Sequence, residues 1–115
     1  SPSFIYMESV RMLYLEGKSG KKYRFYSFPS FSRFKKAGGV YVLTNRVRDN
    51  QKLTHKVLHV GSTEDLSMLN EMYSGPENRC KEGANCVIVK IEDNTDTRLE
   101  TFEDLKSRYL ESAAN

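Results

Sequence analysis

The most constraining feature of this chain is a nearly continuous apolar run of strand length in its last third. The run occupies residues 85–92, and its apolar members are Cys86, Val87, Ile88, Val89 and Ile91. A half-buried strand alternates apolar and polar residues, whereas a continuous run is typical of a strand that is covered on both faces. We therefore expect this segment to be the central buried strand of a sheet.

Two hairpins are expected to supply the neighbouring strands. The first is predicted from Val10 to Leu15 and from Tyr23 to Phe28, because both runs are β-prone and flank a turn that holds two glycines. The second is predicted from 40–44 and 56–61, with the polar segment 45–55 as a wide connection. Side chains in the first hairpin alternate as expected for strands that are buried on one face.

Two helices complete the predicted α/β fold. Thr63 has the character of an N-cap, and two acidic residues follow it, where the helix dipole favours negative charge. This short helix is expected to end at Gly75-Pro76. A final helix is expected after the polar turn 93–96, with one apolar face made of Leu99, Phe102, Leu105 and Tyr109.

The length of 115 residues fits one domain, 1–115, with a single hydrophobic core. Residues 1–6 precede a candidate natural start at Met7 and are expected to be non-native or disordered. No apolar run is long enough to cross a bilayer and no signal-peptide pattern opens the sequence, so we expect a cytoplasmic protein without a membrane partner. Cys80 and Cys86 have no histidine near them in sequence, which favours reduced thiols over a structural metal site.

Charge is distributed unevenly along the chain. Residues 1–56 hold 12 Lys and Arg against three acidic residues, whereas residues 57–115 hold six against 12, although the net charge is only +3. Such asymmetry can create a basic face for nucleic acid or an acidic protein. The alternative is that the two halves neutralise each other across the fold. Candidate contacts of a basic face are Lys21, Lys22, Arg24, Arg33, Lys35, Lys36, Arg46 and Arg48.

The loop between the two predicted hairpins carries Phe31 and Phe34 beside basic residues. Aromatic rings in such a setting can stack on bases. Packing of both rings against the sheet edge is the simpler interpretation.

Two short motifs fall on the strands of the second hairpin. Gly39-Val40-Tyr41 and His59-Val60-Gly61, the latter followed by Ser62-Thr63-Glu64-Asp65-Leu66, resemble the two triplets that name the GIY-YIG nuclease family. The segments Gly17–Tyr23 and Gly83–Cys86 resemble those of small bacterial GIY-YIG proteins of unassigned function. The resemblance spans about Leu15 to Tyr109. It implies a small GIY-YIG-like sheet flanked by helices, with an added N-terminal hairpin.

The resemblance also implies which residues would form a nuclease site. Members of the family use a divalent metal, tyrosines, a helical arginine that stabilises phosphate and a glutamate that binds the metal. Here Tyr41 keeps the first tyrosine and His59 replaces the second, but Leu69 occupies the arginine position and Phe102 the glutamate position. Because cation and metal supply the main stabilisation of the developing charge, we expect a vestigial site with no catalytic residues, no metal and no cofactor.

The leading hypothesis is therefore an inactive GIY-YIG-like module that binds a macromolecular partner, either nucleic acid or protein. The alternative is a divergent nuclease that uses Tyr41, His59 and His55 with Mg²⁺ held by Glu100 or Glu103. A homodimer that pairs through the Phe-rich loop or the edge of the N-terminal hairpin is a third hypothesis. The motif glycines and the ring of Tyr41 can also be explained by packing alone.

Overall fold

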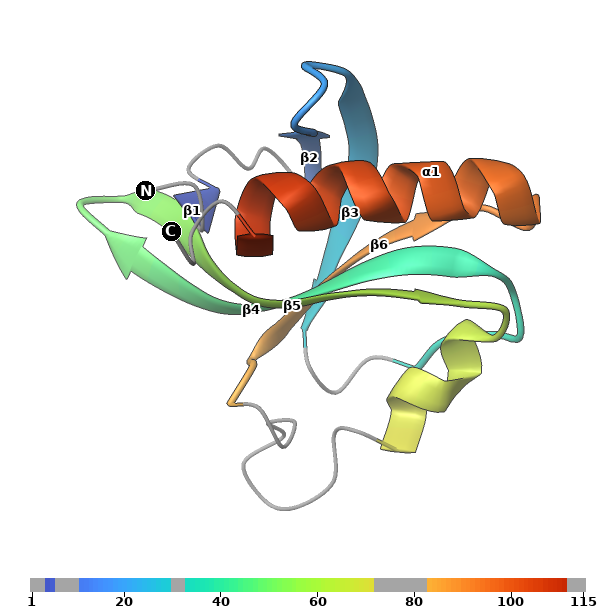
Figure 1. Cartoon of the computed structure of the whole chain (residues 1–115). Coiled ribbons are helices and arrows are strands. Elements are labelled where there is room, and N and C mark those ends of the chain that lie inside the picture. Colours follow the sequence, from blue (N-terminus) through green and yellow to red (C-terminus); the bar gives the residue numbers. More distant parts are fainter. Residues whose placement is uncertain (1–3, 6–10, 30–32, 72–82, 112–115) are drawn as a thin grey trace.

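The computed structural model describes residues 4–5, 11–29, 33–71 and 83–111, and within them it is a mixed α/β fold (Figure 1). One antiparallel sheet has the strand order β1-β5-β4-β6-β3-β2. Because β1 has only two residues, five strands form the body of this sheet. The strands are β1 (Phe4–Ile5), β2 (Met12–Glu16), β3 (Lys22–Pro29), β4 (Gly39–Asp49), β5 (Lys52–Thr63) and β6 (Cys86–Ile91).

The apolar run is confirmed as the central strand. β6 pairs with β4 on one side and with β3 on the other, so it joins the two hairpins into one sheet. Its residues Cys86 to Val89 are all buried. Continuous apolarity in the sequence thus reflects burial on both faces.

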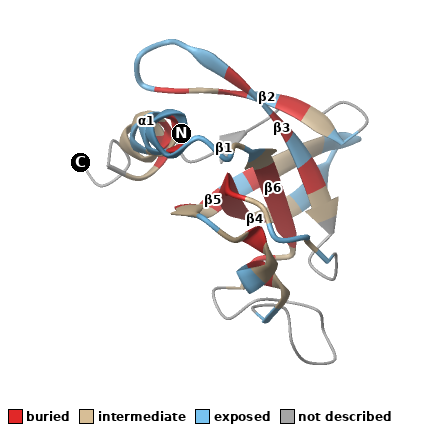
Figure 2. Cartoon of the chain, turned by 90° about the vertical axis from the view of Figure 1, so that its right-hand side faces the viewer, coloured by how far each residue is buried: buried red, intermediate tan, exposed pale blue. Residues whose placement is uncertain are grey.

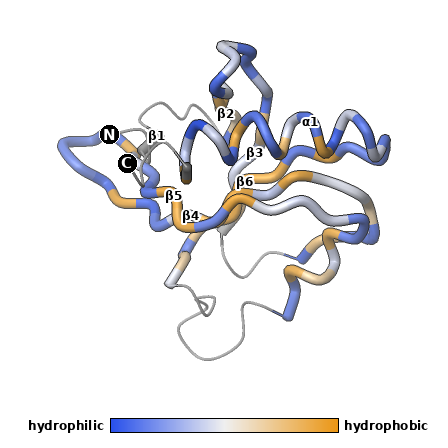
Figure 3. The backbone as a smooth tube through the Cα atoms, viewed as in Figure 1, coloured by the Kyte–Doolittle hydropathy of each residue, from blue (hydrophilic) through white to orange (hydrophobic). Residues whose placement is uncertain are grey.

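The N-terminal hairpin forms as expected from β2 and β3, but the polar connection predicted at 45–55 is wrong. Residues 45–49 continue β4 and residues 52–55 belong to β5, so that the connection is the two-residue turn Asn50-Gln51. Both turn residues have positive φ, 49° and 67°, as tight hairpin turns require. Figure 3 shows this end of the hairpin as hydrophilic. Backbone hydrogen bonds between β4 and β5 stabilise this end of the hairpin, and a hydropathy pattern does not predict such bonds.

Helical elements cover the two faces of the sheet. The helix α1 (Thr95–Lys106) lies on one face, and the 3-10 helix η1 (Leu66–Glu71) lies on the other (Figure 1). The predicted start at Thr63 is wrong, because Thr63 ends β5 and Asp65 instead accepts hydrogen bonds from the backbone and the hydroxyl of Ser67. The expected end at Gly75-Pro76 lies outside the described residues. A π-helical turn, η2 (Ser107–Glu111), extends α1.

The buried face of α1 differs from the predicted apolar stripe. Asn94 caps the helix by accepting a hydrogen bond from the Thr97 amide at 2.9 Å, and the buried residues are Arg98, Thr101 and Leu105. Leu99 is 46% exposed, so its placement in the apolar stripe is wrong, and Phe102 is only partly buried. The helix is rotated toward a buried polar side chain, Arg98, that the apolar pattern does not reveal.

Two hydrophobic clusters lie on opposite faces of the sheet, which we call the α1 face and the η1 face. The alternation of β4 separates them, since Val40 and Val42 belong to the cluster beneath α1 and Tyr41 and Leu43 to the cluster against η1. Figure 2 shows the same alternation of buried and exposed residues along β3. Phe34 packs against the η1-face cluster and meets the ring of Phe28 edge-on at 5.3 Å, which confirms the packing interpretation for this ring. Phe31 lies outside the described residues.

The N-terminal residues, the cysteines and the lengths of the helices bear on three further expectations. Within residues 1–6, Phe4 and Ile5 form β1 and pair with Lys56 and His55 of β5. Cys86 is a buried thiol, as expected for at least one of the two cysteines, while Cys80 lies outside the described residues. No helix within the described part of the chain is long and apolar enough to span a membrane.

Candidate functional site

A cleft of about 460 Å³ lies where the outer edge of β5 meets the first turns of α1. Among the described residues, β1 covers β5 only at His55 and Lys56, so the edge that follows is open to the cleft. Most of the lining therefore comes from one end of β5 and the N-terminal half of α1. The lining residues are Tyr41, His59, Val60, Gly61, Ser62, Thr63, Glu64, Thr95, Arg98, Leu99 and Phe102.

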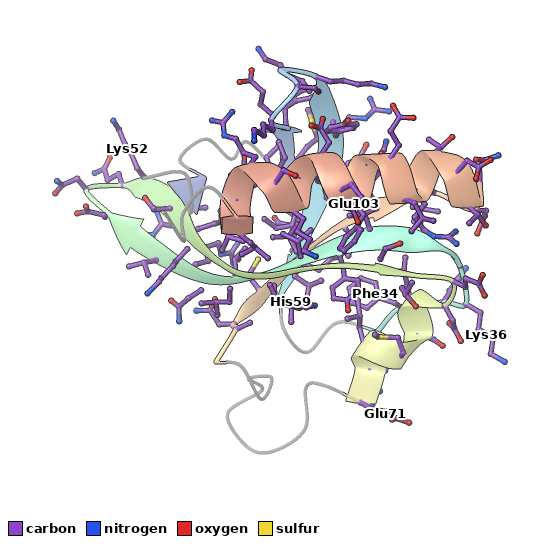
Figure 4. The ribbon with its side chains drawn as sticks, viewed as in Figure 1. Phe34, Lys36, Lys52, His59, Glu71 and Glu103 are labelled. Atoms are coloured by element: carbon purple, nitrogen blue, oxygen red, sulfur yellow. The ribbon has the colours of Figure 1, made fainter. Side chains whose placement is uncertain are left out.

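The two motif residues of the sequence, Tyr41 and His59, are neighbours in this cleft. Their ring centroids are 5.8 Å apart at an interplanar angle of 40°. Tyr41 is 5% exposed, and its ring lies over Gly61, where an added Cβ would collide with it. His59 is exposed on the side of the sheet away from α1 (Figure 4). Gly61 thus has a packing reason of its own, which is to make room for the tyrosine ring.

The opposite wall of the cleft is built around Arg98, which is 3% exposed. Its Nη1 donates to the carbonyl oxygens of Glu92 at 3.0 Å and Asp93 at 3.2 Å, so it fixes the turn between β6 and α1. Nη2 lies 3.4 Å from the hydroxyl of Thr95. The Nε of Arg98 has no hydrogen-bond partner among the described residues. A buried donor without a partner is costly, so a ligand that accepts a hydrogen bond here would recover that cost.

The positive charge of Arg98 is poorly compensated. Within the described part of the chain, the carboxylate recorded near it is that of Glu64, 4.0 Å from Nη2, and the Glu64 side chain is 87% exposed. An ion pair at this distance with one partner in water contributes little. The cleft is therefore lined by a buried cation whose charge is only weakly compensated.

Arg98 and the motif residues approach the cleft from different faces of the sheet. Tyr41 and His59 belong to the η1 face, whereas Arg98 and Phe102 belong to the helix on the α1 face. They border one cleft because it extends around the edge of β5 at Gly61. A substrate group bound by Tyr41 and His59 would thus lie on the η1 face, whereas Arg98 lies on the α1 face.

Leu69 and Phe102, to which the resemblance assigns the arginine and glutamate positions, pack against the clusters on opposite faces of the sheet. Phe102 lines the cleft, packs partly against the α1-face cluster and has the ammonium of Lys106 5.6 Å from its ring centroid. Leu69 is fully buried on η1 in the cluster of the other face and does not line the cleft. The cation of the cleft is thus Arg98. Sequence reasoning missed its role, and the signal available was a charged residue between apolar positions of an amphipathic helix.

The metal ligands of the alternative nuclease hypothesis lie elsewhere. Glu100 and Glu103 line a separate cavity of about 340 Å³ between α1 and the β2–β3 hairpin. His55 is fully buried and its Nδ1 lies 2.9 Å from the hydroxyl of Thr44. Within the described residues, no three His, Cys, Asp or Glu side chains are grouped to hold a metal ion.

A hydrogen-bonded contact at the edge of this separate cavity holds the β2–β3 hairpin against α1. Asp104 accepts from the backbone and the hydroxyl of Ser19 at 2.9 and 2.6 Å and from the hydroxyl of Tyr23 at 2.8 Å. Although burial alone raises the pKa of Asp104, these hydrogen bonds and the charge of Lys21 lower it overall. Burial, followed by the hydrogen bond and charge of Asp104, raises the pKa of Tyr23 to about 12. This contact is structural.

The eight candidate basic contacts are distributed over three places. Lys21, Lys22 and Arg24 lie on the β2–β3 hairpin, which projects beyond α1, while Arg46 and Arg48 lie on the part of β4 that leads to the opposite hairpin tip (Figure 1). The third group precedes β4 near η1, where Arg33 lies 3.4 Å from the carbonyl oxygen of Asn70. The members of this third group are Arg33, Lys35 and Lys36.

No protein-family model, curated protein or solved structure matches this chain.

Proposed function

We propose that the chain is a GIY-YIG-like module that binds nucleic acid without cleaving it, and that the cleft between Tyr41 and Arg98 receives a phosphate of the backbone. The observation that carries the proposal is the buried guanidinium of Arg98, which lines the cleft with its Nε unpartnered among the described residues. Arginine suits phosphate because its planar donors are always charged and point in fixed directions.

Binding without cleavage is supported by what surrounds Arg98. Hydrolysis of a phosphodiester requires an activated water and charge stabilisation at the same phosphorus. Here the tyrosine and histidine approach from the face opposite to Arg98, and the residue that the resemblance assigns to the position of the metal-binding glutamate is Phe102. Glu100 and Glu103, the metal ligands of the alternative nuclease hypothesis, line the other cavity, and the carboxylate among the lining residues of the cleft is that of Glu64.

Binding and cleavage can be tested with the same labelled oligonucleotides. Fluorescence anisotropy with single- and double-stranded DNA and RNA at two salt concentrations measures affinity, and incubation with Mg²⁺ or Mn²⁺ followed by electrophoresis measures cleavage. We expect binding that weakens steeply with salt through counterion release, and intact nucleic acid. A protein that shows no binding at the lower salt concentration contradicts the proposal, and an acidic protein partner then becomes the alternative.

A substitution that adds a negative charge tests whether nucleic acid binds in the cleft. His59→Glu adds one negative charge at an exposed lining position, and Thr54→Glu adds the same charge on β5 outside the lining. We expect His59→Glu to weaken binding several-fold more than Thr54→Glu, since repulsion acts over a few ångströms in a partly buried site. Equal effects would place the binding surface elsewhere.

Cleavage by the natural chain that is lost in Tyr41→Phe would establish the divergent nuclease instead. The reverse experiment, restoring the nuclease pattern by Leu69→Arg with Phe102→Glu, is unsuitable. Leu69 is fully buried in the η1-face cluster, so an arginine there would place a charge in the core rather than in the cleft.

A further inference from the structure

We infer that the part of the η1 face that the described residues leave exposed, formed by Tyr14, Arg24, Tyr26 and Ile91, binds unpaired bases of single-stranded nucleic acid. We call this surface the tyrosine face. The inference rests on the proposed function for the class of partner, but the surface is separate from the cleft and shares no lining residue with it.

The tyrosine face follows from the register of the N-terminal hairpin. Tyr14 of β2 lies opposite Arg24 of β3, and the next pair on the same face is Met12 opposite Tyr26. The two tyrosines are therefore diagonal neighbours, with Arg24 beside one and Val89 of β6 beside the other. Residues of the opposite alternation, Leu13, Leu15, Tyr23 and Phe25, are buried beneath α1.

The tyrosine face exposes large apolar side chains to an unusual extent. Tyr14 is 55% exposed, Tyr26 46% and Ile91 67%, and together they are half of the exposed large apolar side chains found in the described part of the chain. The helix η1 and the segment before β4 cover the η1 face as far as Phe28, which packs on Phe34. Their described residues do not cover the two tyrosines or Ile91. Contiguous exposed apolar side chains on an otherwise well-packed sheet mark an interaction surface.

Charge complementarity selects the partner. Lys22 and Arg24 are exposed on the same face of β3, and a groove of about 200 Å³ beside Tyr26 is lined by Arg24, Phe28, Val89, Lys90 and Ile91. The acid at this end of β2, Glu16, is bound by Arg108 at 3.0 Å, so it does not offset these cations. Rings that stack on bases beside cations that meet phosphates are the recognition chemistry of single strands, whose bases are accessible.

The inference is tested with labelled oligo(dT) and oligo(U) and with a duplex of the same length. We expect Tyr14→Ala and Tyr26→Ala each to weaken single-strand binding about 5- to 100-fold, the effect of losing one stacked base. Tyr14→Phe and Tyr26→Phe keep the ring and should bind almost as the natural chain does. Met68→Ala, which removes a similarly exposed apolar side chain from η1 outside both the cleft and the tyrosine face, is the matched control and should change nothing.

The design separates this inference from the proposed function. Single-strand binding that persists in the double Tyr→Ala variant but falls in His59→Glu overturns the tyrosine face and leaves the proposed function intact. Loss in the tyrosine variants with no effect of His59→Glu supports the tyrosine face and contradicts the role of the cleft. If light scattering shows a dimer that the double Tyr→Ala variant converts to a monomer, a second copy covers this surface and the inference is wrong.

Discussion

Glu64 Oε1 lies 4.0 Å from Nη2 of Arg98, although the side chain of Glu64 is 87% exposed and that of Arg98 is 4% exposed. The pair therefore joins a hydrated anion to a buried cation across the cleft. Water screens the carboxylate, so its attraction to the guanidinium is weak. An anionic ligand in the cleft would nevertheless have to displace or tolerate it.

Removing this carboxylate is expected to strengthen anion binding. Glu64→Gln keeps the size of the side chain and abolishes its charge, so affinity for an oligonucleotide should rise about 2- to 10-fold at low salt and less at high salt. Glu71→Gln is the matched control, because Glu71 is an exposed acid on η1 that does not line the cleft. Anisotropy titrations measure both. Equal gains in the two variants would mean that only net charge matters.

The hairpin contact of Asp104 predicts a loss of stability in acid. The pKa of Asp104 is lowered in the folded chain, so its contribution is full above the ordinary pKa near 4 and disappears as the pH falls through the lowered value. Asp104→Asn should reduce the free energy of unfolding at pH 7 by about 1 kcal/mol, after allowance for solvent screening. In urea titrations the difference should shrink as the pH falls below about 4. Glu103→Gln, on the exposed side of the same helix, should have little effect at either pH.

Tyr23 predicts the opposite dependence in alkali. Its pKa of about 12 exceeds the ordinary value of 10, so its contribution is full below pH 10 and is lost as the pH rises toward 12. Denaturant titrations between pH 9 and 12 should show a shallower loss of stability in Tyr23→Phe than in the natural chain. Tyr14→Phe is the control, because Tyr14 is 55% exposed. Tyr109, whose pKa is also raised by burial, contributes equally to all three proteins.

The burial of a single side chain, that of Leu69, is expected to provide much of the packing of the short helix η1 against the sheet. Leu69 is fully buried in the η1-face cluster, so Leu69→Ala should lower the free energy of unfolding by about 2–5 kcal/mol through lost burial and the cavity left behind. Met68→Ala is the neighbouring control, with a side chain that is 41% exposed, and should cost less than about 1 kcal/mol. Similar losses from both would show that η1 is packed differently from the arrangement described above.

The β4–β5 turn offers a stabilising substitution. Gln51 has a φ of 67°, a left-handed conformation that costs a residue with a side chain about 1–2 kcal/mol. Gln51→Gly should therefore stabilise the chain, by roughly 1 kcal/mol or less because glycine loses more entropy on folding. Gln51→Ala removes the same polar group without relieving the backbone and should give no gain. Thermal unfolding of both variants compares them directly.

Much of the fold could be predicted because it depends on local patterns. The apolar run at 85–92 is central because only a strand covered on both faces tolerates such continuity, and two glycines between alternating runs produced the N-terminal hairpin. The candidate site was predicted less well. Tyr41 and His59 are neighbours, but the nuclease pattern places its phosphate-stabilising cation at the position of Leu69, whereas the cation that lines the cleft is Arg98.

What the sequence determined by itself is the presence of the five longer strands, the position of the last helix and which strand lies at the centre, because these follow from residue periodicity. Only the tertiary structure decided how far β4 and β5 extend, since backbone pairing carries them through the polar stretch that leads to Asn50. It also decided the rotation of α1, which buries Arg98 and exposes Leu99, because the carbonyl oxygens of a preceding turn hold the guanidinium in place. Backbone pairing across the β4–β5 hairpin and hydrogen bonds to the turn before α1 set these features, and hydropathy periodicity does not encode either kind of contact.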